Sequence, residues 1–175
     1  MLRDRSMGHR HDLVSCLLDD GDGSCRDLNF EAPTWKGLHR TLESLGRMFA
    51  DGSVSNHEGQ SPSEPYPISL ASIPRGGGSA VLQKGTGPLS RLQVFVAAED
   101  DGSPFIELTF FPEDVAQTQG LRDEFIRWAD GLRVELEARR LYVRYENASW
   151  EFGDVSPSSG VFFVMPRDAS SADAR

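Results

Sequence analysis

The densest cluster of polar and aromatic side chains in the sequence lies between residues 142 and 154. Its members are Tyr142, Arg144, Tyr145, Glu146, Asn147, Trp150, Glu151 and Asp154. In an extended strand Tyr142, Arg144 and Glu146 would share one face. Glu146 and Asp154 could act as a general acid and base while Arg144 holds an anion. Tyrosine, tryptophan and arginine are also the residues that dominate protein interfaces. Cross-strand packing with an Arg–Glu pair explains the same cluster without any function.

No catalytic motif accompanies this cluster. The sequence has no Gly-x-Ser-x-Gly elbow that would position a serine nucleophile. His39 falls on a predicted helix and His57 in a predicted loop, each without an evident partner. The glycine-rich segments 75–79 and 84–87 each precede a strand, whereas a phosphate site needs the N-terminus of a helix. We therefore predict no catalytic residue, and a binding function ranks above catalysis.

Two groups of side chains have the types that bind metals, but their context argues against a metal site. The first has the spacing of a calcium loop and consists of Asp20, Asp22, Ser24 and Glu31. Cys25 stands where that loop requires glycine, so an acidic surface turn is the favoured interpretation. The second group matches no compact zinc module and consists of His9, His11, Cys16 and Cys25. We predict neither a metal nor a cofactor.

The charge of the chain limits its partners. The 175 residues include 18 basic and 27 acidic ones, a net charge of −9. Such a field repels nucleic acid and anionic membranes and attracts a basic protein. No apolar run approaches the roughly 18 residues of a membrane helix, and two cysteines are too few for a disulfide framework. We therefore expect a cytoplasmic protein with a protein partner.

Two segments have apolar residues at every third or fourth position, which predicts amphipathic helices. The first runs from Trp35 to Phe49 with Thr34 as its N-cap, and the second spans residues 119–139. Gly131 inside the second costs about 1 kcal/mol relative to alanine. This glycine indicates either a kink or a close contact between helices.

Short apolar or alternating segments between turn-forming residues predict strands. They cover residues 68–73, 80–83, 92–98, 105–111, 141–147, 149–152 and 161–165. We predict an α+β fold, in which a single antiparallel sheet of about five to seven strands carries two main amphipathic helices on one face. The residues expected to pack the helices on the sheet are Trp35, Leu42, Leu45, Phe125, Trp128 and Leu132.

The domain organisation follows from the same patterns. Residues 12–165 are predicted to form one domain, in which residues 12–18 are a strand or a helical turn and residues 51–67 are a long polar loop. Residues 1–11 and the tail 166–175 lack apolar periodicity, so we expect both to be disordered.

The leading functional hypothesis is a non-enzymatic acidic module that binds a basic protein. Its most concrete form is a bacterial immunity or antitoxin-like inhibitor, which needs only to block a basic cleft. The predicted contact acids are Asp100, Asp101, Glu107, Glu113, Asp114, Glu146, Glu151 and Asp154. Glu107 joins the cluster at 142–154 as a predicted binding residue.

Two alternatives remain open at this stage. One is a small enzyme or small-molecule-binding protein with a pocket around Arg144, Tyr145, Glu146 and Trp150. The other is a structural subunit of an assembly, which would bury a self-complementary apolar patch.

Overall fold

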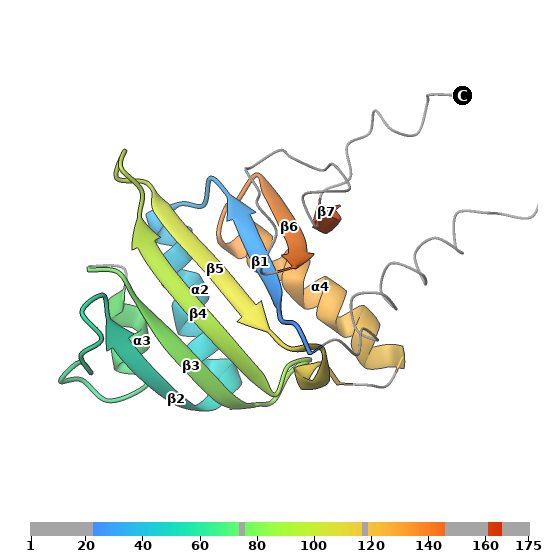
Figure 1. Cartoon of the computed structure of the whole chain (residues 1–175), viewed down its shortest axis with the longest axis horizontal. Helices are drawn as coiled ribbons and strands as arrows, with labels where there is room; N and C mark the ends of the chain where they lie inside the picture. Colours follow the sequence, from blue (N-terminus) through green and yellow to red (C-terminus); the bar gives the residue numbers. More distant parts are fainter. Residues whose placement is uncertain (1–22, 74–75, 117–118, 146–160, 166–175) are drawn as a thin grey trace, which may run out of the picture.

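The computed structural model describes residues 23–73, 76–116, 119–145 and 161–165, which form one antiparallel sheet with helices on one face (Figure 1). The sheet has seven strands in the order β2-β3-β4-β5-β1-β6-β7. The strands are β1 (Arg26–Glu31), β2 (Phe49–Asn56), β3 (Gly78–Gly85), β4 (Arg91–Ala98), β5 (Pro104–Phe110), β6 (Arg140–Tyr145) and β7 (Val161–Met165). The helices are α2 (Trp35–Met48), α3 (Ile68–Ser72), the 3-10 turn η2 (Pro112–Asp114) and α4 (Gln119–Glu135). The predicted α+β class is confirmed.

The core lies between the sheet and the main helices α2 and α4. Leu28 of β1 pairs in register with Leu108 of β5 and Val143 of β6, so three aliphatic side chains form a row under the helices. The helix side chains that meet the sheet are buried and include Leu38, Leu42, Leu45, Phe125, Leu132 and Leu136. Alternation of apolar and polar positions along β5 produces this one-sided burial, as predicted.

Helix α2 begins where the sequence predicts. The hydroxyl of Thr34 accepts a hydrogen bond from the backbone N–H of Gly37 at 3.0 Å, which satisfies one of the first N–H groups of the helix. Trp35, however, does not pack in the core. Its side chain is at the surface, and its indole N–H donates to the carbonyl oxygen of Gly102 at 2.9 Å. Trp128 is only partly buried against the core.

The acidic surface turn predicted over residues 20–31 is wrong for residues 26–31, which form β1, a strand between β5 and β6. The calcium-type spacing on which that interpretation rests gives no role to Asp27 and Asn29. Both side chains are buried in the structure, because neighbouring strands supply their polar partners.

Two further predictions near the sheet edge need correction. Residues 68–72 form the short helix α3 and not a strand, and the Ser72 hydroxyl donates to the carbonyl oxygen of Ile68 at 3.1 Å within it. The prediction of a long loop over residues 51–67 is also wrong for residues 51–56, because β2 extends to Asn56. Small polar side chains suit this edge strand, where one side of the backbone has no neighbouring strand among those described.

Several predictions fall outside the described residues. They concern residues 1–11, the element at 12–18, the strand at 149–152 and the tail 166–175. Within the described helices, none combines the length and the apolar character needed to cross a bilayer.

Helices α2 and α4 are joined at a close crossing between Gly37 and Leu136. The backbone N–H of Thr34 donates to the carbonyl oxygen of Leu136 at 3.0 Å, and Arg40 forms an ion pair with Glu137 at 2.6 Å. Hydrogen bonds from Thr34 and then Arg40 lower the pKa of Glu137. A Cβ atom on Gly37 would overlap the Leu136 backbone, whereas nothing lies within 4 Å of such an atom on Gly131. Of the two alternatives predicted at Gly131, a kink or a close contact, the close contact is wrong, and the structure has such a contact at Gly37 instead.

The two glycines predict opposite effects of the same substitution. Gly37→Ala should lower the free energy of unfolding by about 3 kcal/mol, because the helices must separate to admit the methyl group. Gly131→Ala should raise it by about 0.5–1 kcal/mol, since alanine has less backbone freedom to lose in an exposed helix position. Urea denaturation followed by circular dichroism measures both. Similar effects of the two substitutions would contradict the close crossing.

Candidate functional site

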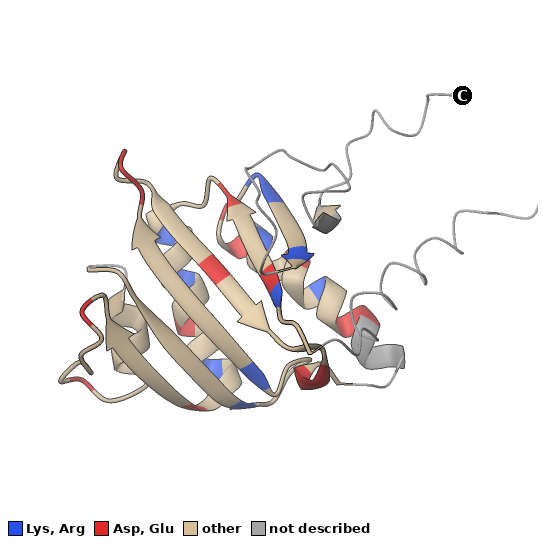
Figure 2. Cartoon of the chain, viewed as in Figure 1, with Lys and Arg blue, Asp and Glu red and all other residues tan. Residues whose placement is uncertain are grey.

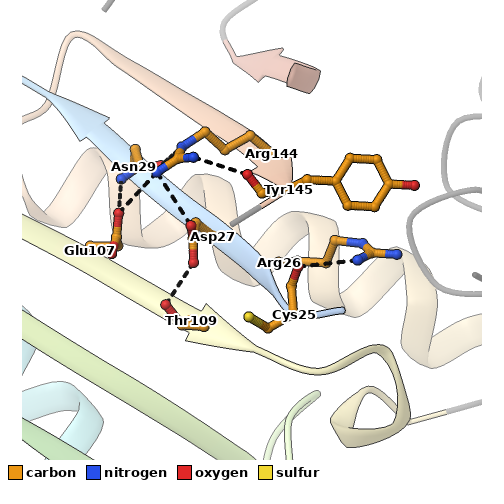
Figure 3. A network of polar contacts seen from close by, with 8 residues as sticks. All are labelled: Cys25, Arg26, Asp27, Asn29, Glu107, Thr109, Arg144 and Tyr145. Atoms are coloured by element: carbon orange, nitrogen blue, oxygen red, sulfur yellow. Dashed lines mark hydrogen bonds and ion pairs between the residues drawn. The ribbon is translucent and has the colours of Figure 1, made fainter. Parts of the chain in front are cut away.

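The candidate site lies on the face of the sheet opposite α2 and α4, which we call the outer face. Side chains alternate along β1, so Leu28 and Phe30 enter the core while Asp27 and Asn29 point to the outer face. Asp27 pairs in register with Thr109 and Arg144, and Asn29 with Glu107 and Tyr142. The strand order β5-β1-β6 therefore brings polar side chains from three strands together (Figure 3).

Arg144 is the centre of this network. Its Nη2 atom lies 3.3 Å from Asp27 Oδ2 and 3.3 Å from Glu107 Oε2. Its Nε atom donates to Asn29 Oδ1 at 2.8 Å, and its Nη1 atom donates to the carbonyl oxygen of Tyr145 at 2.9 Å. The guanidinium group therefore joins β6 to both β1 and β5.

The carboxylates are also held by neutral donors. Asn29 Nδ2 donates to Glu107 Oε2 at 2.7 Å, and the Thr109 hydroxyl donates to Asp27 Oδ1 at 2.7 Å. Asp27 and Asn29 are each 1% exposed, while the side chain of Glu107 keeps 25% of its exposure. The network is thus buried at β1 and reaches the surface at β5.

The other face of the same strands carries a second arginine. Arg26 is fully buried, and its guanidinium carbon lies 4.2 Å from the centre of the Tyr145 ring. Its Nη1 atom donates to the Ser24 hydroxyl at 2.6 Å and to the Cys25 carbonyl oxygen at 3.1 Å. Tyr145 therefore packs against a buried cation and does not share a face with Arg144.

The structure brings together some of the predicted binding residues. Arg144 and Glu107 meet directly across the sheet, an arrangement of the kind expected from cross-strand packing with an Arg–Glu pair. Tyr142 is completely buried, and its hydroxyl donates to Glu31 Oε2 at 3.2 Å, so it is not available to a partner. The remaining predicted residues lie outside the described part of the chain and are Glu146, Asn147, Trp150, Glu151 and Asp154.

Sequence reasoning missed Asp27 and Asn29. A signal was present, because these residues and Glu31 alternate with Leu28 and Phe30, the period of a strand with one apolar face. The segment was interpreted through its metal-ligand spacing instead. Among the described residues no group of three or more histidine, cysteine, aspartate or glutamate side chains could hold a metal ion.

The predicted contact acids that lie in the described part of the chain do not form one patch. Figure 2 shows acidic residues in the turn between β4 and β5 and in η2, at opposite ends of β5. Asp100 and Asp101 lie in the turn, and Glu113 and Asp114 lie in η2. Hydrogen bonds from the side chain and the backbone N–H of Ser103 lower the pKa of Asp101. The turn between β4 and β5 therefore presents a charge that persists in mild acid.

The network is better suited to presenting charge than to holding an anion. The predicted enzyme site requires Arg144 to bind an anionic substrate. The guanidinium group is instead engaged by Asp27, Glu107 and Asn29 within the sheet. A buried guanidinium with carboxylate partners is an expected structural arrangement, because either charge alone would be costly to bury.

Comparison with known proteins supports a relation of fold. No protein-family model and no curated protein sequence matches the chain. The structure is similar to a chain in the crystal structure of the toxic C-terminal tip of CdiA from Pseudomonas aeruginosa in complex with its immune protein. The TM-score is 0.53 at 14% identity, covering 81% of this chain and 94% of that chain. The similarity concerns the fold and does not distinguish the toxin tip from the immune protein.

The network predicts unequal effects of two arginine substitutions. Arg144→Met should lower the free energy of unfolding by about 3–5 kcal/mol, because it leaves the buried Asp27 carboxylate without its guanidinium partner. Arg139→Met should cost less than about 1 kcal/mol, because Arg139 is 69% exposed in its pair with Glu31. Chemical denaturation of both variants gives the comparison. A loss of unfolding free energy for Arg144→Met as small as that for Arg139→Met would contradict the role of the buried network in stability.

Proposed function

We propose that the protein is a bacterial immunity-type protein that binds a basic toxin domain in the cytoplasm and blocks its active cleft. The observation that carries the proposal is the fold similarity to a chain of a toxin–immune protein complex, over 94% of that chain. The net charge of −9 favours the inhibitor over the toxin role. A toxin domain that acts on a polyanion needs a basic cleft, and an acidic inhibitor is complementary to it.

The described structure supports recognition by a preformed surface. The turn between β4 and β5 is closed by hydrogen bonds from Glu99 N–H to the Ser103 carbonyl oxygen at 2.8 Å and from Gly102 N–H to the Glu99 carbonyl oxygen at 2.9 Å. Gly102 has a φ angle of 80°, which glycine adopts at little cost. A rigid acidic turn loses little conformational entropy on binding, so more of the interaction energy contributes to affinity.

No specific observation favours the alternative of a small-molecule pocket around Arg144 and Tyr145. These two side chains lie on opposite faces of β6, and both are engaged with other residues of the fold. An inhibitor needs no reactive group, so the inhibitor hypothesis is consistent with a structural role for both Arg144 and Tyr145.

Affinity capture tests the proposal. The tagged protein is incubated with a native bacterial lysate at about 50 mM and at about 500 mM salt, which changes the screening of charges. We expect one basic protein to be retained in near-equal amount at low salt and to be released at high salt. The purified pair should form a one-to-one complex in which the partner loses its activity. An isolated partner whose activity is unaffected by the complex would contradict the inhibitor role.

Charge-neutralising variants identify the contribution of the turn. The double substitution Asp100→Asn with Asp101→Asn removes two charges from the turn, and Glu43→Gln with Glu124→Gln removes two from α2 and α4. We expect the first variant to weaken binding about threefold to tenfold, mainly through slower association, and the second to have little effect. Isothermal titration with the purified partner measures both. Equal losses would indicate attraction by net charge alone.

A further inference from the structure

We propose that Phe95 and Glu107 form a receptor for one arginine side chain of a protein partner, on the outer face of the sheet. The proposal rests on the proposed function only in taking the ligand to be part of a basic protein. The proposal specifies which side chains would contact the partner, whereas the net charge and the fold similarity do not identify any contact.

Phe95 and Glu107 are neighbours across two strands. They are opposite one another in the register of β4 and β5, and side chains in such positions have Cβ atoms about 4.5–5.5 Å apart. Both residues alternate with core residues, Val94 and Val96 on β4 and Ile106 and Leu108 on β5. Their side chains therefore project from the outer face together.

Phe95 offers an aromatic surface that the fold leaves uncovered. It is 47% exposed, although phenylalanine favours the interior. Phe105 packs against it edge-on, with ring centres 6.1 Å apart at 67°. On the other side its register partner on β3 is Ser79, whose short side chain covers little of the ring. The ring is thus contacted by Phe105, and about half of the residue remains accessible to a partner.

Glu107 is a carboxylate with one occupied and one available oxygen. Asn29 and Arg144 both approach Oε2, at 2.7 and 3.3 Å. Within the described residues no hydrogen bond or ion pair reaches Oε1. The side chain is 25% exposed, so the buried network fixes its orientation while one acceptor faces outward.

An aromatic ring beside a fixed carboxylate matches the chemistry of arginine. A guanidinium group stacks on an aromatic face through cation–π attraction and donates hydrogen bonds in its own plane to a carboxylate. The net charge of −9 attracts such a side chain. Arg91 is the basic residue on the same face of β4, four residues from Phe95. At about 3.4 Å per residue it is more than 10 Å away, so salt largely screens its repulsion.

A titration with a small probe tests the receptor on the full chain. N-acetyl-arginine amide is added to ¹⁵N-labelled protein at low ionic strength, and backbone amide shifts are followed. N-acetyl-citrulline amide is the control, because it has a similar shape without the charge. We expect saturable shifts at residues 94–97 and 106–108 with the arginine probe, and at least fivefold weaker binding of citrulline.

Two variants and one control connect the shifts to the proposed residues. Phe95→Leu keeps an apolar side chain without the ring, and Glu107→Gln keeps the acceptor for Asn29 and Arg144 without the charge. Each should weaken arginine binding at least threefold, whereas Glu43→Gln on α2 should not. Shifts centred on residues 99–101, or equal binding of citrulline, would overturn the receptor.

The same variants separate this inference from the proposed function. If Phe95→Leu and Glu107→Gln lower affinity for the captured basic partner at least tenfold while thermal unfolding is unchanged, the receptor is supported in the complex. If both variants bind and inhibit the partner like the unmodified protein, the receptor is wrong and the inhibitor role stands. If arginine binds as expected but the captured partner keeps its activity in the complex, the inhibitor role is wrong and the receptor stands.

Discussion

The burial of polar side chains on β1 is the constraint on which the rest of the sheet depends. Asp27 and Asn29 lie in a strand with neighbours on both sides and have almost no exposure. A buried carboxylate without a partner would destabilise the fold by several kcal/mol, so the flanking strands must supply a guanidinium and further polar groups. Arg144 and Glu107 meet this requirement only in one register. A shift of a single residue would turn these polar side chains into the core and Leu28 out of it.

The network fixes a different role for each face of the sheet. On the helix side, the aligned apolar residues provide the surface on which α2 and α4 pack, and the approach at Gly37 holds the two helices against each other. On the outer face, Asp27, Asn29 and Tyr142 of β1 and β6 are buried, whereas Phe95 on β4 is exposed. The network meets the surface at Glu107, between these two regions. The buried charge network and the proposed arginine receptor are thus adjacent on this face of the sheet.

This arrangement suits a protein that acts by occupying another molecule. Strands held by a cross-strand network and a closed turn provide a rigid surface, and rigidity limits the entropy lost on binding. Among the described contact acids, Asp100 and Asp101 lie at one end of β5 and Glu113 and Asp114 at the other, so long-range attraction and local contact at Glu107 would involve different residues. Charge would then govern how quickly a basic partner arrives, and the aromatic and carboxylate pair would govern which side chain it inserts.

The sequence alone determined the elements whose patterns are local. The three- and four-residue spacing predicted α2 and α4, and alternation with turn residues predicted β3, β4 and β5, because burial of one face leaves a trace within each segment. Only the tertiary structure decided that Arg26–Glu31 is an interior strand and that Arg144 pairs with Asp27 and Glu107. The partners of Asn29 are 78 and 115 residues away along the chain, so no local pattern contains them. A polar residue can be buried when distant strands satisfy it, and strand order is decided by the packing of the whole sheet.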